Sequence, residues 1–371
     1  MSQELSIFRV VDELIEQPSW GGDFITKLKG LDRTPKWVGK KVGQAYELAI
    51  GSRVIDLATG VEAALEQIIT ASPEEILGDK VVAQHGSTLN LLIKLTQAKG
   101  NSFQVHLPEG DHLKHWQPKP EAWFYLGPGL YTFGLNQGTS YADFSTALKS
   151  IDRKMHELSE KVIAGKLDVD EARRRAAVFI AEQDPYQYIN IVHAKTDDIV
   201  DLTAGGIHHS WEEDASVYPD GNLVYEVQVD VQDEYCSMRG FDKGKILDNG
   251  KIRPTHVDDY LATVSQDPER SDLSRYIQRP SVVAEDDSKK RESLFRTKYF
   301  NLDRVVINGS HTDTISTSDG LQHIFVLAGE GALNEYKIKA GQSYVITAKA
   351  GYAVLQASSK GMTVLQTWLP V

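Results

Sequence analysis

The sequence predicts a mainly β protein with two jelly-roll barrels and an α-helical segment inserted into the first barrel. Two runs that alternate polar and apolar residues lie between residues 102 and 126. Apolar residues recur at helical spacing within residues 140–183, and short strands separated by glycine turns recur after residue 295. Alternation is typical of half-buried strands, and helical spacing is typical of amphipathic helices. Many short strands at regular spacing, separated by glycine turns, are typical of barrels.

The first alternating run carries candidate metal ligands. Side chains two apart on a strand share a face, so Ser102, Gln104 and His106 should point one way, away from the apolar residues between them. A second alternating run begins at Glu121. The two runs can bring an imidazole, a carboxamide and a carboxylate together inside a barrel. This donor set suits a divalent transition metal, zinc above all.

A third candidate ligand lies about ninety residues later. Residues 201–209 have an apolar approach, a Gly-Gly turn and two adjacent histidines. One histidine of the pair should face inward; we favour His208, although a shift of register by one residue would exchange it with His209. His112 and His115 follow the first run in a polar loop and are weaker rivals.

Residues 140–183 differ in character from the rest of the chain. Ser140 begins a capping pattern, apolar residues follow at helical spacing, and Asp168 begins a second helix after a glycine. We therefore expect a helical hairpin inserted between barrel strands. The arginine triplet 173–175 is either a phosphate or partner patch or a solvated helix face paired with nearby acidic residues, and we favour the second.

The remaining segments complete the predicted organisation. Short strands and turns are expected over residues 1–58, helices over Val61–Ile69 and from Ser72, a strand over Leu89–Leu95, and further strands over 188–210 and 222–230. The polar residues 266–292 are expected to form a mobile connector or an active-site flap. The predicted units are a metal-binding domain of residues 1–139 and 184–265, the helical hairpin 140–183, the connector 266–295, and a C-terminal domain 296–371 without a metal site.

The composition excludes several functional classes. The net charge of −12 argues against nucleic acids and anionic membranes as main partners. A single cysteine, Cys236, allows no disulfide framework and indicates a reducing, cytoplasmic compartment; we interpret it as a packed residue rather than a catalytic thiol. No apolar run approaches the roughly 20 residues that span a bilayer, and no signal peptide is expected at the start. Lys243 and Lys245 could line a basic pocket but are interpreted as solvated surface charges.

Several of these segments resemble one family, the type I mannose-6-phosphate isomerases, which are metal-dependent cupins. Asn101–Leu107 resembles the family's Leu-Ser-Ile-Gln-Val-His-Pro strand, and Pro118–Phe124 resembles its Gly-Lys-Thr-Glu-Ala-Trp-Tyr segment. Thr203–His209 is similar to its Pro-Ala-Gly-Thr-Val-His-Ala segment. Trp20–Gly22, Gly43–Leu48 and Arg253–His256 are similar to further family segments. The sequence departs from the pattern at Leu107, at Pro120 and between Asp230 and Arg239.

The resemblance implies a role for each matching residue. Gln104, His106, Glu121 and His208 would hold one divalent metal ion, zinc or another transition metal. Arg239 and Lys119 would be catalytic. Ser102, Lys94 and Lys119 would bind the phosphate or hydroxyls of the substrate, although Lys94 is equally well interpreted as a charge at a strand end.

The expected activity is the interconversion of mannose 6-phosphate and fructose 6-phosphate through a cis-enediol. The partner would be a sugar phosphate, and the chain would act as a monomer or a homodimer. The residues leave the proton-transfer group open among a metal-bound water, a carboxylate and a histidine. Two alternatives also stay open: a related metallo-cupin acting on another sugar or sugar acid, and a non-catalytic sugar-binding protein.

Overall fold

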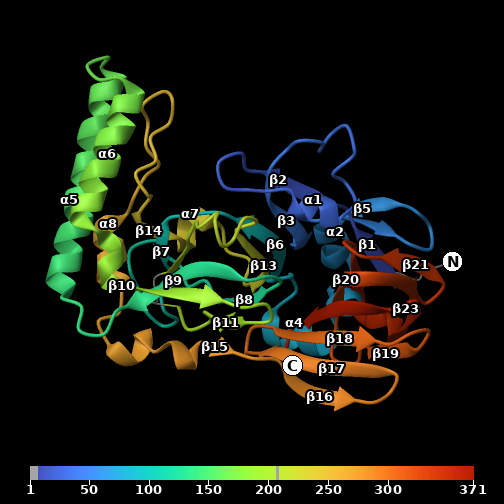
Figure 1. Cartoon of the computed structure of the whole chain (residues 1–371). Coiled ribbons are helices and arrows are strands. Elements are labelled where there is room, and N and C mark those ends of the chain that lie inside the picture. Colours follow the sequence, from blue (N-terminus) through green and yellow to red (C-terminus); the bar gives the residue numbers. More distant parts are fainter. Residues whose placement is uncertain (1–6, 206–208) are drawn as a thin grey trace.

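The computed structural model describes residues 7–205 and 209–371 and is mainly β (Figure 1). Sheets fill the middle and one side of the molecule, and a pair of long helices stands at the other side. The mainly β class predicted from the sequence is confirmed.

An antiparallel seven-stranded sheet carries most of the pocket described below. Its order is β15-β11-β8-β13-β6-β3-β2. The middle strands β6, β8 and β13 are buried along their whole length, which requires cover on both faces of the sheet. The strands are β2 (Glu13–Glu16), β3 (Val42–Leu48), β6 (Leu92–Ala98), β8 (Glu121–Tyr125), β11 (Ile199–Asp201), β13 (Asn222–Gln228) and β15 (Ile277–Gln278).

A five-stranded antiparallel sheet packs on one of these faces. Its order is β10-β9-β12-β7-β14. An aromatic core fills the space between the two sheets, with Trp123 and Tyr125 from one sheet against Tyr131, Phe133 and Trp211 from the other. The strands are β7 (Phe103–Val105), β9 (Gly129–Leu135), β10 (Ile189–Ala194), β12 (His209–Trp211) and β14 (Met238–Phe241).

An eleven-stranded sheet contains the C-terminal part of the chain and also its first described strand. Its main path runs β16-β17-β18-β23-β20-β22-β1-β4-β5, with β19 on β23 and β21 on β20. Phe8 in β1 pairs with Val345 in β22, so the two ends of the chain share one sheet. The strands are β1 (Ile7–Val10), β4 (Arg53–Asp56), β5 (Glu62–Ala64), β16 (Ser281–Glu285), β17 (Lys289–Arg296), β18 (Asn301–Ile307), β19 (Thr312–Ser316), β20 (Gln322–Leu333), β21 (Tyr336–Lys339), β22 (Ser343–Ile346) and β23 (Tyr352–Trp368).

The helices predicted within residues 140–183 are present as a long hairpin. Helix α5 (Tyr141–Ile163) begins after Ser140, whose side chain accepts a hydrogen bond from the Asp143 backbone. Helix α6 (Val169–Gln183) begins after Asp168, which caps it in the same way. Arg174 and Arg175 pair with Glu171 on the same helix, as predicted for a solvated face.

Shorter helices cover the sheets. They are α1 (Phe24–Leu28), α2 (Leu65–Ala71), α3 (Pro73–Leu77), α4 (Asp79–His85), α7 (Asp233–Cys236) and α8 (Val257–Thr263), with the 3-10 turns η1 (Pro185–Tyr188), η2 (Pro268–Ser271), η3 (Leu273–Arg275) and η4 (Ala348–Ala350). The helix predicted over residues 61–69 is only partly correct. Residues 62–64 form β5 instead, because they pair with β4 across a tight hairpin, and the helix begins at Leu65.

The polar segment 266–295 contains regular structure. It holds η2, η3 and β15, and then β16 with most of β17. Strand β15 pairs with β11, and β16 pairs with β17 at the edge of the eleven-stranded sheet. Within the described ranges, no helix is long and apolar enough to cross a membrane.

Candidate active site

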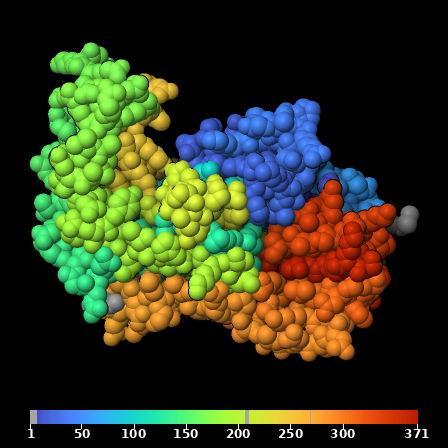
Figure 2. Space-filling view, in the orientation of Figure 1, coloured from blue at the N-terminus to red at the C-terminus, as the bar shows by residue number. Residues whose placement is uncertain are grey.

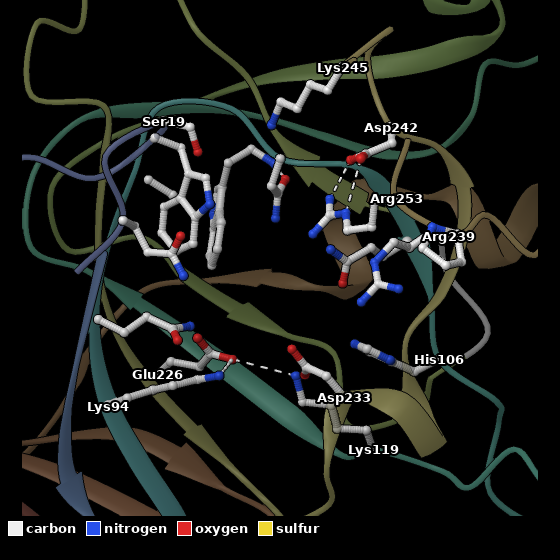
Figure 3. A pocket seen from close by; sticks show the side chains of 18 of the residues that line it. Ser19, Lys94, His106, Lys119, Glu226, Asp233, Arg239, Asp242, Lys245 and Arg253 are labelled. Carbon is white, nitrogen blue, oxygen red and sulfur yellow. Dashed lines mark hydrogen bonds and ion pairs between the residues drawn. The ribbon is translucent and has the colours of Figure 1, made fainter. Parts of the chain in front are cut away.

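A pocket of about 580 Å³ opens between the N-terminal segment, the edges of the two smaller sheets and the loop after β14 (Figure 3). Its inner wall is formed by strands β6, β7, β8 and β13, and its outer wall by residues after β14. The lining residues are Gln17, Ser19, Trp20, Gln44, Lys94, Ala98, Asn101, Gln104, His106, Lys119, Glu121, Trp123, Trp211, Glu226, Asp233, Arg239, Asp242, Lys245, Leu247, Lys251, Ile252, Arg253 and Pro254.

His106 and Glu121 meet at the bottom of this pocket. Both are buried, and His106 Nε2 lies 3.0 Å from Glu121 Oε1. The other ring nitrogen, Nδ1, lies 2.8 Å from the carbonyl oxygen of Cys236. A carbonyl oxygen can only accept, so Nδ1 carries a hydrogen and Nε2 is the nitrogen directed at the carboxylate. A backbone carbonyl on the far nitrogen is also the support that metal-binding histidines usually have.

Gln104 lies on the same strand as predicted. The apolar residues Phe103 and Val105 are buried in the core beneath the hairpin, whereas Gln104 lines the pocket. Its Nε2 donates to Ser102 Oγ at 2.9 Å, which leaves its carbonyl oxygen as the atom suited to a metal. Ser102 itself is fully buried behind the pocket wall.

The fourth predicted metal ligand, His208, lies outside the described residues. The neighbouring backbone nevertheless returns to the site. Gly205 adopts a φ of +60°, and a Cβ there would lie 2.7 Å from the oxygen of Leu107, just after His106. Strand β12 then begins at His209, whose backbone pairs with that of Gln104. Among the described residues, no three His, Cys, Asp or Glu side chains are arranged to hold a metal. His112 and His115 are exposed and do not line the pocket.

Two lysines and two glutamates alternate along the inner wall. Lys119 Nζ lies 2.9 Å from Glu121 and 3.7 Å from Glu226, and Lys94 Nζ lies 3.3 Å from Glu226. Burial would lower the pKa of Lys119, but Glu121 and Glu226 outweigh it and hold the pKa well above its usual value. Lys119 therefore stays charged, and its charge is balanced inside the protein.

Three carboxylates that line the pocket, Glu226, Asp233 and Asp242, were not predicted from the sequence. Burial raises the pKa of Glu226 above the usual glutamate value, although Lys94 and Lys119 oppose this rise. Asp233, on α7, behaves in the opposite way. Burial would raise its pKa, but Lys119, Lys94 and His106 outweigh burial and the pKa is lowered. An acidic residue inside the apolar strand β13 was a signal that could have identified Glu226.

The outer wall is basic. Arg239, on β14, pairs through its backbone with Gln104, and its buried Nε has no hydrogen-bond partner among the described residues. Burial and the neighbouring Arg253 lower the pKa of Arg239. Arg253 binds both carboxylate oxygens of Asp242 and lies 3.3 Å from Ser102 Oγ.

The interpretation of Lys243 and Lys245 as solvated surface charges is wrong. Lys243 is largely buried and pairs with Glu212 beside Tyr186. Lys245 lines the pocket, and its Nζ lies 3.3 Å from the oxygen of Gly100. Both lysines lie on the loop after β14, which brings Lys243 to Glu212 and the Trp211 oxygen and Lys245 to the Gly100 oxygen, contacts that local sequence could not indicate.

Cys236 is buried, as predicted for a packed residue. Burial raises the pKa of its thiol, which opposes formation of a nucleophilic thiolate. The contribution of this residue to the site is its carbonyl oxygen, which orients His106.

Comparison with known proteins identifies the fold. No family model and no curated protein matches the sequence. Among solved structures, the mannose 6-phosphate isomerase from Bacillus subtilis is similar over 98% of this chain and 100% of its own, with a TM-score of 0.69 and 16% identity. A variant of phosphomannose isomerase from Salmonella typhimurium is similar over 99% of this chain and 100% of its own, with a TM-score of 0.68 and 14% identity.

A zinc-bound mannose 6-phosphate isomerase is similar over 99% of this chain and 100% of its own, with a TM-score of 0.67 and 15% identity. These likenesses extend over the whole chain, including the helical hairpin and the C-terminal sheet. The resemblance predicted from the ligand-strand motifs is therefore confirmed at the level of the fold: this chain has the fold of the mannose 6-phosphate isomerases.

Proposed function

We propose that this chain is a metal-dependent aldose–ketose isomerase that interconverts mannose 6-phosphate and fructose 6-phosphate through a cis-enediol. The observation that carries the proposal is one pocket in which the His106–Glu121 pair lies beside two charged lysines and a buried glutamate of raised pKa. The fold shared with mannose 6-phosphate isomerases supports it.

The donor set fits a zinc ion or another divalent transition metal. With Nδ1 of His106 protonated, Nε2 and the Glu121 carboxylate would be two acceptors 3.0 Å apart, an arrangement that needs a cation, either a proton or a metal ion. Gln104, His106 and Glu121 would hold the ion, with His208 as the fourth ligand. When bound, the metal would supply positive charge at the sugar oxygen on which negative charge develops.

Glu226 is our candidate for the group that moves the proton between C1 and C2. A general base works best when its pKa lies near the working pH, and burial raises the pKa of this carboxyl. Thr96 Oγ1 donates to one of its oxygens at 3.1 Å and fixes the carboxylate, while the other oxygen faces Lys94 and Lys119. Proton transfer to and from one carboxylate on one face of the sugar suits a cis-enediol.

Lys119 and Lys94 would stabilise the enediol oxygens. Both ammonium groups are already oriented by carboxylates and need little rearrangement during the reaction. Asp233, with its lowered pKa, stays ionised and would accept a hydrogen bond from a sugar hydroxyl.

The phosphate would bind at the outer wall. Arg239 offers a buried Nε that has no hydrogen-bond partner within residues 7–205 and 209–371, and Lys245 and Arg253 line the same side of the pocket. The buried Ser102 hydroxyl accepts hydrogen bonds from Gln104 and Arg253 and would orient the Arg253 guanidinium from behind the pocket wall. Binding the remote phosphate would align the sugar carbons with the inner wall.

We also propose the finer organisation predicted from the sequence. Residues 1–139 and 184–265 would form a metal-binding cupin barrel, 140–183 its helical insertion, and 296–371 a second cupin barrel without a metal, joined by 266–295. A cytoplasmic location is proposed because the chain has one cysteine.

Metal removal tests the function. The purified chain is analysed for metal and assayed for isomerisation of mannose 6-phosphate before and after exhaustive chelation. We expect about one divalent ion per chain, loss of activity on removal and recovery on adding zinc. Full activity after complete metal removal would falsify the mechanism.

The same assay separates the alternatives. Turnover of an unphosphorylated sugar or sugar acid in place of mannose 6-phosphate would favour the related metallo-cupin. Metal and sugar binding without turnover of any of these compounds would favour the binding protein.

A further inference from the structure

The outer wall of the pocket is made by Arg239 on β14 and by the loop that follows this strand, residues 242–254, which we call the basic loop. It joins β14 to α8 and brings Lys245, Lys251 and Arg253 to the pocket. The loop contributes three cations to the pocket and one carboxylate, Asp242. Arg253 already binds this carboxylate. The loop thus presents a net positive charge to any ligand.

The basic loop rests on the helical hairpin, not on the sheets alone. In Figure 1 it rises beside α5 and α6, and in Figure 2 the surface is hollowed between this loop, in gold, and the N-terminal segment, in blue. Ser159 on α5 donates to the oxygen of Gly250 at 2.7 Å in a buried contact. Ile246 is buried in the core that the loop shares with both helices.

Two glycines fit the loop to the helices. Gly244 and Gly250 have φ values of +70° and +80°, which favour glycine. A Cβ at Gly244 would lie 2.5 Å from Ile180, and one at Gly250 would lie 2.7 Å from Val162. The contact between loop and hairpin is therefore close on both sides of the turn.

Arg173 joins α6 to the tip of the loop. Its Nε and Nη2 donate to the oxygen of Ile246 at 3.1 and 2.9 Å, and Nη2 also contacts Asp248 at 2.6 Å. Its neighbours Arg174 and Arg175 contact Glu171 on their own helix instead. One arginine of the triplet is thus used to hold the loop, although Arg173 does not line the pocket.

We propose that the α5–α6 hairpin is the support that fixes the basic loop in the position in which it binds the anionic end of the substrate, with Arg173 as the positioning residue. The identification of that end as the phosphate of a sugar rests on the proposed function. The binding of a phosphate-type anion by the basic loop does not rest on it. Because Lys245 and Arg253 lie on the same loop as the Arg173 contacts, a shift of the tip moves the cations that face the ligand.

The test compares Arg173→Met with Arg174→Met in the full-length, zinc-loaded chain. Methionine keeps an apolar stem and removes the donors, and Arg174→Met removes an equal charge from the adjacent position. Hydrogen exchange of residues 242–254 and the affinity for inorganic phosphate are measured by mass spectrometry and calorimetry. Gly250→Ala provides a second route to the same displacement. Gly165→Ala is its control, because no described residue other than its chain neighbours lies within 4 Å of a Cβ at Gly165.

We expect faster exchange confined to the basic loop and phosphate affinity about tenfold weaker in Arg173→Met and Gly250→Ala, with both controls unchanged. If the chain isomerises mannose 6-phosphate, KM should rise about tenfold with kcat nearly constant. Equal phosphate affinity in Arg173→Met and Arg174→Met would overturn the proposal, as would a wild-type chain that binds no phosphate. If the wild type does not isomerise mannose 6-phosphate but the variants show the expected changes in phosphate affinity, only the proposed function would be wrong.

Discussion

At the scale of single residues, different surroundings move the pKa values of two pocket carboxylates in opposite directions. Glu226 is buried in strand β13 and its pKa is raised, whereas the cations around Asp233 lower the pKa of that residue. Pairs of acids whose pKa values are moved apart are the usual basis for assigning different roles to them. Glu226 is accordingly the candidate base, and Asp233 a permanent negative charge.

Replacing Glu226 by Gln should lower kcat by about 10²- to 10⁴-fold, because the amide keeps the shape of the side chain but cannot take up the proton. Zinc content should not change. In the wild type, activity should fall as the pH drops through the raised pKa of Glu226, since the base must be ionised. Stopped assays of kcat against pH provide the measurement.

Glu292→Gln is the matched control for Glu226→Gln. Glu292 is also buried and pairs with Arg304, but in the eleven-stranded sheet away from the pocket. Its loss should reduce stability and leave kcat unchanged. A Glu226→Gln chain with wild-type kcat would exclude this residue as the base.

Lys119→Met and Lys94→Met should separate two effects of positive charge. Either lysine stabilises the ionised form of Glu226, so removing either should move the acid limb of the kcat profile to higher pH. Only Lys119 also contacts Glu121, a proposed metal ligand. Lys119→Met should therefore change zinc affinity as well, measured by competition with a chromophoric chelator, and Lys94→Met should not. Identical zinc affinity in the two variants would place Lys119 outside the metal site.

At the scale of elements, the sequence predicted what depends on local pattern. The alternation around Gln104 placed its apolar neighbours in the core, and the caps at Ser140 and Asp168 marked both helices of the hairpin. The contacts that the sequence did not predict depend on pairing between distant strands. Glu226 meets Lys94 only through the register of β13 and β6. Arg239 meets Gln104 only through the register of β14 and β7, and no local pattern encodes either register.

The turn at Gly205 precedes strand β12, and changing it tests whether this turn positions the proposed metal site. Alanine there would strain a φ of +60° and bring its Cβ to 2.7 Å from the oxygen of Leu107. We expect Gly205→Ala to lose roughly 1–3 kcal/mol of stability and to bind zinc more weakly, because the turn leads into β12 beside Gln104. Denaturation and metal titration provide the two measurements.

Gly165→Ala is the control for this turn. Its φ of +67° is equally unfavourable for alanine, but apart from its two chain neighbours no described residue has an atom within 4 Å of the added Cβ. It should cost only about 1–2 kcal/mol and leave zinc affinity unchanged. Equal zinc affinity in both variants would show that the turn does not position the metal site.

At the scale of the whole molecule, a buried polar network joins the seven-stranded and eleven-stranded sheets. Lys29 Nζ lies 2.9 Å from Glu47 and donates to the oxygen of Gly341 at 2.9 Å, and Ser343 donates to Glu47 at 2.6 Å. Burial would lower the pKa of Lys29, but Glu47 and Asp12 outweigh it and the pKa is raised. The contacts with Gly341 and Ser343 join residues that are 312 and 296 positions apart, so composition and periodicity could not reveal them.

His323 lies in this same network and gives the molecule a pH dependence. It is fully buried between the Tyr225 hydroxyl and the oxygen of Glu47, and burial lowers its pKa from 6.5 to about 3. Between these two pH values the unfolded chain binds a proton here and the folded chain does not. Stability should therefore fall as pH falls below about 6.5, by up to about 1.4 kcal/mol per pH unit from this residue.

The contribution of His323 to the pH dependence of stability is measured by comparing His323→Gln with the wild type. Both are unfolded with guanidinium chloride at pH 7, 6 and 5. Other groups contribute to the acid loss in both proteins, so the difference between the two slopes measures His323. We expect the variant to be less stable at pH 7, because its contacts with Tyr225 and Glu47 are disturbed, but to lose less stability on acidification. His311→Gln, at an exposed position, should keep the wild-type slope. If His323→Gln also keeps the wild-type slope, the prediction is wrong. His323 would then be able to take up a proton in the folded chain, and the imidazole between the two sheets would not be held neutral.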